Sequence, residues 1–121
     1  MNENAKKWVA ALRSGKWSQT RDQLRDIAEE PCSYCCLGVA CEISGLGEWC
    51  DYSDYVDEEG SSELTLTPAV KKWLGMKTAD GELSLNGRPN NLARLNDTGK
   101  TFSEIADIIE ANQDQLFVAE E

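Results

Sequence analysis

Residues 32–43 read Cys32-Ser33-Tyr34-Cys35-Cys36-Leu37-Gly38-Val39-Ala40-Cys41-Glu42-Ile43. Nearly every side of this stretch is apolar or small, and a helix that is hydrophobic all round is a buried helix. Gly38 would let a neighbouring segment approach the helix backbone closely, because glycine has no Cβ. Pro31 closes the preceding segment, since the residue before a proline is biased away from helix, and Ser44-Gly45 ends the stretch. The sequence therefore predicts a buried central helix.

Helices are also expected towards both ends of the chain. An N-terminal helix that stops at Ser14-Gly15 has one apolar face with the spacing i, i+3, i+4, i+7, formed by Ala5, Trp8, Val9 and Leu12. A C-terminal helix begins with a capping box of Thr101 and Glu104, and its apolar face consists of Phe102, Ile105, Ile108 and Ile109. Pro68 opens a short helix that runs through Leu74, because proline favours the first helical turn.

Short strands are expected between these helices. Residues 49–56 and 63–67 have aromatic and alternating character on either side of the turn-forming residues 59–62, which favours a hairpin. A second hairpin is indicated by the turn dipeptides Asp80-Gly81 and Asn86-Gly87. Residues 16–30 fit either a helix or an extended segment. Together these elements predict a small single α+β domain over residues 1–121, with a buried central helix, N- and C-terminal helices and short antiparallel hairpins.

Length and composition indicate a cytoplasmic protein. No apolar run approaches the roughly 20 residues that a membrane-spanning helix needs, and the polar N-terminus has no signal-peptide core. Four of the five cysteines lie within residues 32–41, whereas a secreted disulfide framework would spread them along the chain. We therefore expect free thiols in a reducing compartment and no contact with a membrane.

The formal net charge of −10 is concentrated in the middle of the chain. Residues 31–70 contain eight acidic side chains and no Lys or Arg. Such a segment repels phosphate backbones, so direct binding to nucleic acid is not expected, and it attracts basic protein surfaces. The carboxylates form a predicted acidic docking face, consisting of Asp51, Asp54, Asp57, Glu58, Glu59 and Glu63. The alternative is that this charge serves only solubility.

The chain contains no histidine, which removes the usual general base near neutral pH and every Ser-His or Cys-His nucleophile pair. We therefore expect neither an enzyme nor a cofactor. A small enzyme remains an alternative, with Cys35 or Cys36 as nucleophile or Asp97 as base. A zinc module is a further alternative, because four sulfur donors are available: Cys32, Cys35, Cys41 and Cys50. Since knuckle spacing is present only in the first pair, small core-filling thiols are the favoured interpretation.

Polar residues beside aromatic ones provide a candidate binding pocket. Arg13, Trp17 and Gln19 lie near the end of the first helix, and Arg94, Asn96 and Asp97 precede the last one. Arginine and tryptophan together can hold a phosphate and stack a base. The alternative is structural: Trp17 packs on the core, Gln19 bonds to backbone, and residues 96–99 form a turn.

Three blocks of this sequence resemble a group of small uncharacterised proteins encoded by bacteriophages and prophages. The blocks are Trp8-x-x-Ala11-Leu12-Arg13-Ser14-Gly15-x-Trp17-x-Gln19, then Tyr34-Cys35-Cys36-Leu37-Gly38-Val39-Ala40-Cys41-Glu42, then Leu95-Asn96-Asp97-x-Gly99-x-x-Phe102-x-x-Ile105-Ala106. This chain departs from the group in having Trp17 where tyrosine is usual and in a more acidic segment from Thr20 to Glu30.

The resemblance implies a setting in a bacterial host cell, where small phage proteins without catalytic groups commonly act by occupying a target. We therefore expect a non-enzymatic inhibitor in the host cytoplasm that neutralises a component of bacterial immunity. In the leading version, the acidic face docks on a basic surface of a host defence protein. In the alternative version, the pocket of Arg13, Trp17 and Asn96 sequesters a nucleotide-like immune signal.

Overall fold

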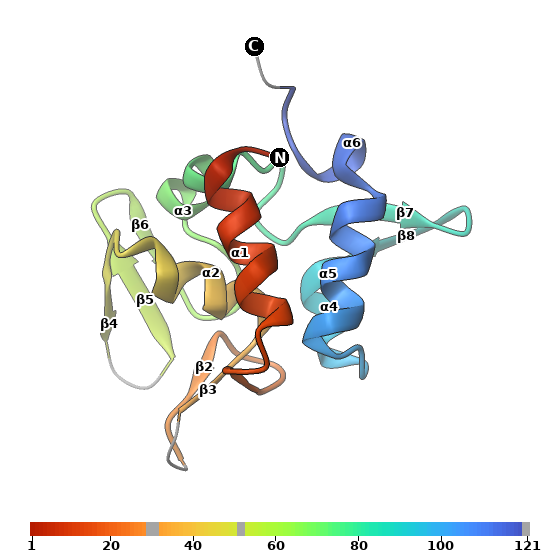
Figure 1. The fold of residues 1–121 in the computed structure, drawn as a ribbon. Helices are drawn as coiled ribbons and strands as arrows, with labels where there is room; N and C mark the ends of the chain where they lie inside the picture. The colour runs from red at the N-terminus through yellow and green to blue at the C-terminus, as the bar shows by residue number, and fades with distance from the viewer. Residues whose placement is uncertain (29–31, 51–52, 120–121) are drawn as a thin grey trace.

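Helix α2 (Cys36–Ser44) lies at the centre of the fold, with helices α1, α3 and α4 packed against it (Figure 1). The computed structural model describes residues 1–28, 32–50 and 53–119. All six residues from Cys36 to Cys41 are buried, which confirms the predicted central helix. The helix begins after Cys35, whose Sγ accepts a hydrogen bond from the Gly38 N–H at 3.3 Å, and ends at Gly45 in the left-handed region. Pro31, which was expected to close the preceding segment, lies outside the described residues.

A neighbouring segment does approach the backbone of α2 at Gly38. A Cβ atom added to Gly38 would lie 1.9 Å from the Leu24 carbonyl oxygen, well inside van der Waals contact. That oxygen accepts a hydrogen bond from the Cys35 N–H at 3.0 Å. The segment before α2 is therefore fixed directly on the first turn of the helix, and glycine is what allows this distance.

Helices α1 (Glu3–Arg13) and α5 (Phe102–Ala111) pack side by side over the core (Figure 1). The predicted apolar face of α1 is buried, and Trp8 Nε1 donates a hydrogen bond to the Cys36 carbonyl at 2.8 Å. Helix α5 begins with the predicted capping box of Thr101 and Glu104. The remaining helices are α3 (Pro68–Leu74), α4 (Leu92–Asp97) and α6 (Gln113–Leu116). Helix α3 was predicted from Pro68, whereas α4 and α6 were not predicted.

Within the described ranges, the strands form three small sheets beside the helices. In the first, β1 (Ser18–Gln19) pairs in parallel and β2 (Arg25–Asp26) in antiparallel orientation with the central strand β3 (Ser33–Tyr34). The second is an antiparallel meander of β4 (Glu48–Cys50), β5 (Asp54–Asp57) and β6 (Gly60–Ser62). The third is the hairpin of β7 (Glu82–Leu85) and β8 (Arg88–Asn91), which turns at Asn86-Gly87 as predicted. These short strands and helices confirm the α+β class.

The first predicted hairpin was wrong in the position of its turn and of its second strand. The turn between β5 and β6 falls at Glu58-Glu59 instead of residues 59–62, because the Asp57 carboxylate accepts the Glu59 N–H at 2.9 Å and starts the turn earlier. Residues 63–67 were expected as a strand. They lead into α3 instead, and Leu66 is buried in the core. None of the helices in the described ranges is both long and apolar enough to cross a bilayer.

Candidate functional site

Asn96, one of the predicted pocket residues, is fully buried at the end of α4 and holds distant segments together. Its Oδ1 accepts hydrogen bonds from Gln19 Nε2 at 2.7 Å and from the Cys36 N–H at 3.1 Å. Its Nδ2 donates to the Thr20 carbonyl at 2.8 Å. Gln19 also donates to the Lys100 carbonyl at 2.8 Å, in keeping with the structural alternative for this side chain. The Asn96 amide is thus engaged by the protein itself.

Asp97 lies next to this network on the side of the loop after β1. Its Oδ1 accepts the backbone N–H of Asp22 at 2.8 Å, and Asp22 is one of the non-glycine residues with positive φ. The structure therefore brings Gln19, Asn96 and Asp97 together. Their hydrogen bonds hold residues 20–22 against α4.

The other predicted pocket residues lie apart. Arg13 forms ion pairs with Asp107 at 2.9 Å and Glu110 at 2.6 Å on α5. Trp17 packs edge-on against Tyr34, with ring centroids 5.1 Å apart. In the part of the chain that the structure describes, Arg13 and Trp17 line different clefts. Arg13, Trp17 and Asn96 therefore do not line a common pocket, contrary to the predicted nucleotide site.

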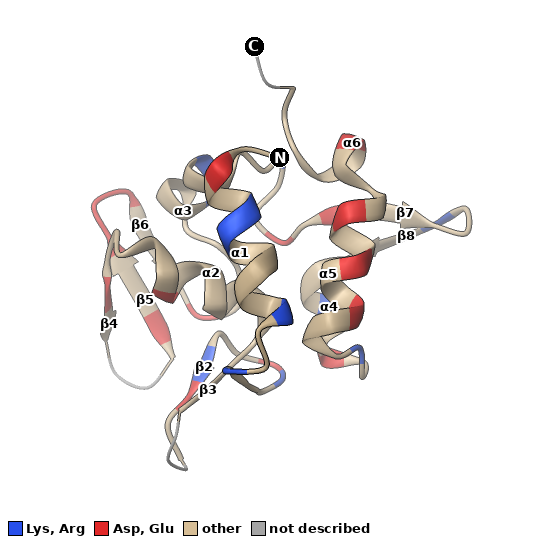
Figure 2. Cartoon of the chain, in the orientation of Figure 1, with Lys and Arg blue, Asp and Glu red and all other residues tan. Residues whose placement is uncertain are grey.

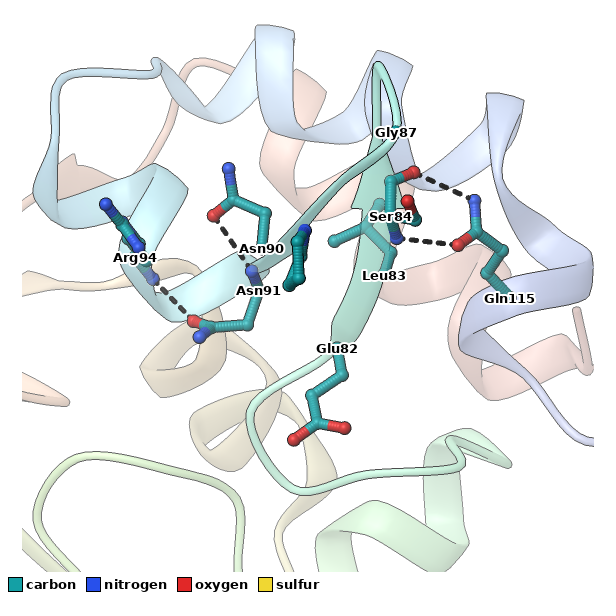
Figure 3. A pocket seen from close by; sticks show the side chains of 9 residues that line it. Glu82, Leu83, Ser84, Gly87, Asn90, Asn91, Arg94 and Gln115 are labelled. Atoms are coloured by element: carbon teal, nitrogen blue, oxygen red, sulfur yellow. Dashed lines mark hydrogen bonds between the residues drawn. The ribbon is translucent and has the colours of Figure 1, made fainter.

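Arg94 stands between two clefts. One, of about 630 Å³, lies between the β7–β8 hairpin, α4 and Gln115 (Figure 3). Its amides serve the fold: Gln115 accepts the Ser84 N–H at 2.6 Å and donates to the Ser84 carbonyl, while Asn91 Oδ1 caps α4 through the Arg94 N–H at 2.7 Å. Among the described residues, no hydrogen bond or ion pair engages the Arg94 guanidinium, and no aromatic side chain lines this cleft.

The second cleft beside Arg94, of about 320 Å³, is lined by carboxylates as well as by the arginine. Asp22, Asp80 and Asp97 all face it, and these negative charges oppose a phosphate. The larger cleft has one carboxylate, Glu82, against three in the smaller one, so it opposes an anionic group less, but no ring lines it to stack a base.

The cysteines separate into buried and accessible thiols. Cys35, Cys36 and Cys41 are buried in or at the start of α2, whereas Cys50 is exposed on β4. Burial raises the pKa of Cys35 to about 11, and burial likewise raises the pKa of Cys36 and of Cys41 well above the ordinary value. A raised thiol pKa disfavours the thiolate that a nucleophile or a zinc ligand needs.

The four predicted zinc donors do not converge. No group of three or more Cys, Asp or Glu side chains in residues 1–28, 32–50 and 53–119 is placed to hold a metal ion. Cys36, the other candidate nucleophile, donates its thiol to the Leu92 carbonyl at 3.6 Å within the core. These contacts agree with thiols that fill the interior.

The predicted acidic docking face lies on the meander sheet, although its carboxylates play different parts (Figure 2). Asp57 points inward and accepts a hydrogen bond from the Thr67 hydroxyl, and Glu59 pairs with Lys72 at 2.8 Å. Asp54, Glu58 and Glu63 have no hydrogen bond or ion pair through their side chains to any described residue. Asp51 lies outside the described residues.

The outward face of the meander contains a further carboxylate, Glu48, that was not among the predicted docking residues. Glu48 is exposed on β4 and lies diagonally across from Asp54, whose direct partner is Cys50. Because side chains alternate along a strand, Glu48, Cys50 and Asp54 point to the same side, and Trp49 and Tyr55 point to the other. Two more carboxylates lie next to the strands, Glu58 in the turn between β5 and β6 and Glu63 directly after β6. We call Glu48, Asp54, Glu58 and Glu63 together the acidic sheet.

A row of aromatic rings runs beside the acidic sheet. Trp17, Tyr34, Trp49 and Tyr55 follow one another with centroid distances of 5.1, 6.0 and 4.9 Å. The Arg25 guanidinium lies over the Trp49 ring, 4.7 Å from its centroid. Glu42 accepts a hydrogen bond from Trp49 Nε1 at 2.6 Å. Burial, followed by the nearby Glu42 carboxylate, raises the pKa of Tyr34.

The aromatic row was missed from the sequence because its members are far apart in the chain. Tyr34 lies in the stretch that reads as core, and Trp49 was assigned to a predicted strand. The available signal was local: Tyr34, Trp49 and Tyr55 lie in short strands and Trp17 directly precedes one, and aromatic residues are typical of strands.

Comparison with known proteins gives a family and no assigned activity. None of the curated proteins and none of the solved structures matches this chain. Residues 1–113 match the model of the family described as "Domain of unknown function (DUF8296)". Because this match covers nearly the whole chain, the protein belongs to the DUF8296 family.

Proposed function

We propose that this protein acts by binding, and that its acidic sheet docks on a basic surface of another protein. The supporting observation is the placement of charge: residues 32–50 and 53–70 contain seven carboxylates and no Lys or Arg, and four of these carboxylates form the acidic sheet. Unpaired surface carboxylates of one sign steer a basic partner towards the molecule and raise its association rate.

The proposed partner is a component of bacterial immunity, such as a nuclease or another effector that uses a basic groove for nucleic acid. The resemblance to phage- and prophage-encoded proteins supports this setting. By covering such a groove, an acidic protein of this size competes with the phosphate backbone for the same cations. Inhibition then requires no catalytic group.

A double substitution tests the docking. Asp54→Asn with Glu58→Gln removes two unpaired charges from the acidic sheet and should weaken binding of a fluorescent nona-lysine peptide roughly tenfold at low salt. Glu82→Gln with Asp114→Asn removes the same charge from exposed positions on β7 and α6 and is the matched control. Fluorescence anisotropy between about 20 and 300 mM salt measures both variants. Equal weakening by the two pairs would contradict docking at the acidic sheet.

The second candidate function, sequestration of a nucleotide-like signal, has one supporting observation. The Arg94 guanidinium faces an open cleft without an ion pair to a described residue. Native mass spectrometry with added nucleoside phosphates tests it, since a retained nucleotide that is lost in Arg94→Ala would favour this function over docking.

A further inference from the structure

A cleft opens at the end of the aromatic row, next to α2. It has a volume of about 450 Å³ and is lined by Lys16, Trp17, Ser18, Cys32, Tyr34 and Glu42. Trp17 and Tyr34 are only partly buried, so their rings are accessible from the cleft. The cleft therefore combines two aromatic rings and a carboxylate, which is a combination suited to an organic cation.

The chain already contains one example of this recognition. Arg25 lies over Trp49 with its guanidinium 4.7 Å from the ring centroid, within the usual range of a cation–π contact. Trp49 is the next ring in the row after Tyr34, at a centroid distance of 6.0 Å. The aromatic row thus accepts a guanidinium group at one ring. Arg25 is also the cross-strand partner of Tyr34, whereas no cation–π contact engages Trp17 among the described residues.

The carboxylate of Glu42 is held in position at this cleft. Its Oε2 accepts the Trp49 Nε1 hydrogen bond at 2.6 Å, which fixes the side chain between α2 and β4. The second oxygen, Oε1, has no hydrogen-bond partner among the described residues. A positioned carboxylate beside aromatic rings can accept N–H groups from a cation that stacks on those rings.

We propose that this cleft receives an arginine side chain of the basic partner, with the guanidinium stacked on Trp17 beside the nearly perpendicular Tyr34 ring and hydrogen-bonded to Glu42. This inference rests on the proposed function, because it names the anchor by which the partner is held. Arginine fits better than lysine, since its planar guanidinium stacks on rings and donates in a fork, whereas an ammonium is a compact, strongly hydrated charge. Trp, Tyr and Arg are also the residues that most often dominate interface energies.

Lys16 is a positive charge on the rim of the cleft, and Arg25 lies beside Tyr34 behind it. Lys16 is exposed on the loop after α1, and its ammonium repels an incoming cation. The charges of Glu42 and Lys16 should therefore have opposite effects. Glu42→Gln should weaken arginine binding, while Lys16→Gln should strengthen it. A nucleotide stacked on the same rings would need Lys16 for its phosphate, so the two substitutions would then act in the opposite directions.

Two peptides of equal length and charge test the anchor. We expect nona-arginine to bind at least fivefold more tightly than nona-lysine, as measured by fluorescence anisotropy at about 150 mM salt. Trp17→Leu should reduce this ratio to about one, because it should weaken nona-arginine binding more than nona-lysine binding. The circular dichroism spectrum and the unfolding midpoint of Trp17→Leu establish that the variant is folded, and Trp17→Phe, which retains a ring, should keep most of the ratio.

The outcomes separate the anchor from the docking. If both peptides bind equally to the unmodified protein, the arginine anchor is wrong and docking by charge stands. If neither peptide binds, the docking itself fails. The cleft is instead a nucleotide site if the unmodified protein binds a nucleoside phosphate, Lys16→Gln abolishes that binding, and nona-arginine and nona-lysine bind equally to both proteins. That result would overturn the inference.

Discussion

Two buried residues illustrate how far a single position can be interpreted from sequence. Gly38 was expected to allow a close backbone approach, because a glycine within a small and apolar helix has few other reasons to be there. Asn96 was assigned to a binding pocket, although it is a buried cross-link between Gln19, Thr20 and Cys36. An amide has the same hydrogen-bonding groups for a ligand as for the backbone, and the partners of Asn96 lie 60, 76 and 77 residues away in the chain.

Gly38→Ala should destabilise the protein by about 3 kcal/mol, because the new Cβ would push against the Leu24 carbonyl and the helix cannot give way. Helix propensity alone predicts the opposite sign, since alanine favours a helix by about 1 kcal/mol over glycine. Urea unfolding measures the difference in the free energy of unfolding. Gly87→Ala is the control, where the added Cβ meets nothing and only the positive φ costs about 1 kcal/mol. A Gly38→Ala protein as stable as the unmodified one would refute the close approach.

At the scale of elements, local signals located the helices better than the strands. The capping box at Thr101, the proline at the start of α3 and the Asn86-Gly87 turn all act within a few residues, and each was predicted correctly. The strands of the first two sheets are two to four residues long and depend on distant partners, such as the parallel pairing of β1 with β3. The candidate site was harder still to predict, because the aromatic row joins residues from four separate segments.

Helix α2 and its N-cap residue Cys35 place three thiols in the interior, so the protein should lose stability at alkaline pH. A group whose pKa is higher in the folded state than in the unfolded chain holds its proton more tightly when folded. Its stabilising effect is full below the unfolded pKa, near 9.0 for a thiol, and is lost as the pH rises towards the folded value, about 11 for Cys35. We expect the free energy of unfolding to fall by roughly 2 kcal/mol between pH 9 and 11 from Cys35 alone.

A matched pair of variants isolates this effect from the titration of lysine and tyrosine. Cys41→Ala removes one buried thiol whose pKa is raised by burial, so its stability should decline less steeply above pH 9. Cys50→Ser changes the exposed thiol on β4 and should leave the slope as it is. Urea unfolding at half-unit steps from pH 7.5 to 10.5 gives the slopes, and parallel curves for all three proteins would contradict the assignment.

At the scale of the whole molecule, the C-terminal segment completes the core. Leu116 and Phe117 are buried, Phe117 bridges to Met76, and the Val118 N–H bonds to the Gly75 carbonyl at 2.8 Å. The match to the DUF8296 family ends at residue 113, before these residues. The part of this chain that buries apolar surface therefore extends past the matched region.

Removing all residues after Gln113 should cost about 4–6 kcal/mol, because two buried apolar side chains are lost at roughly 2–3 kcal/mol each. A decrease of this size in the free energy of unfolding approaches the total stability of an ordinary domain. The shortened chain should therefore be largely unfolded at 37 °C. Thermal unfolding followed by circular dichroism measures the change. A chain that ends at Val118 keeps both side chains and should match the full protein; a shift in that control of the same size would show that the effect has another cause.

The same contacts bring the two ends of the chain together. Asn2 and Asn4 bond to the Trp73 carbonyl and Val118 bonds to Gly75, so both ends are fixed at the C-terminal end of α3, and the β2–β3 hairpin lies at the opposite end of the molecule (Figure 1). A linker attached at either end therefore leaves from the side away from that hairpin and its aromatic neighbours. Immobilised on a sensor chip or a bead through either end, the protein would present the cleft between Trp17, Tyr34 and Glu42 outward.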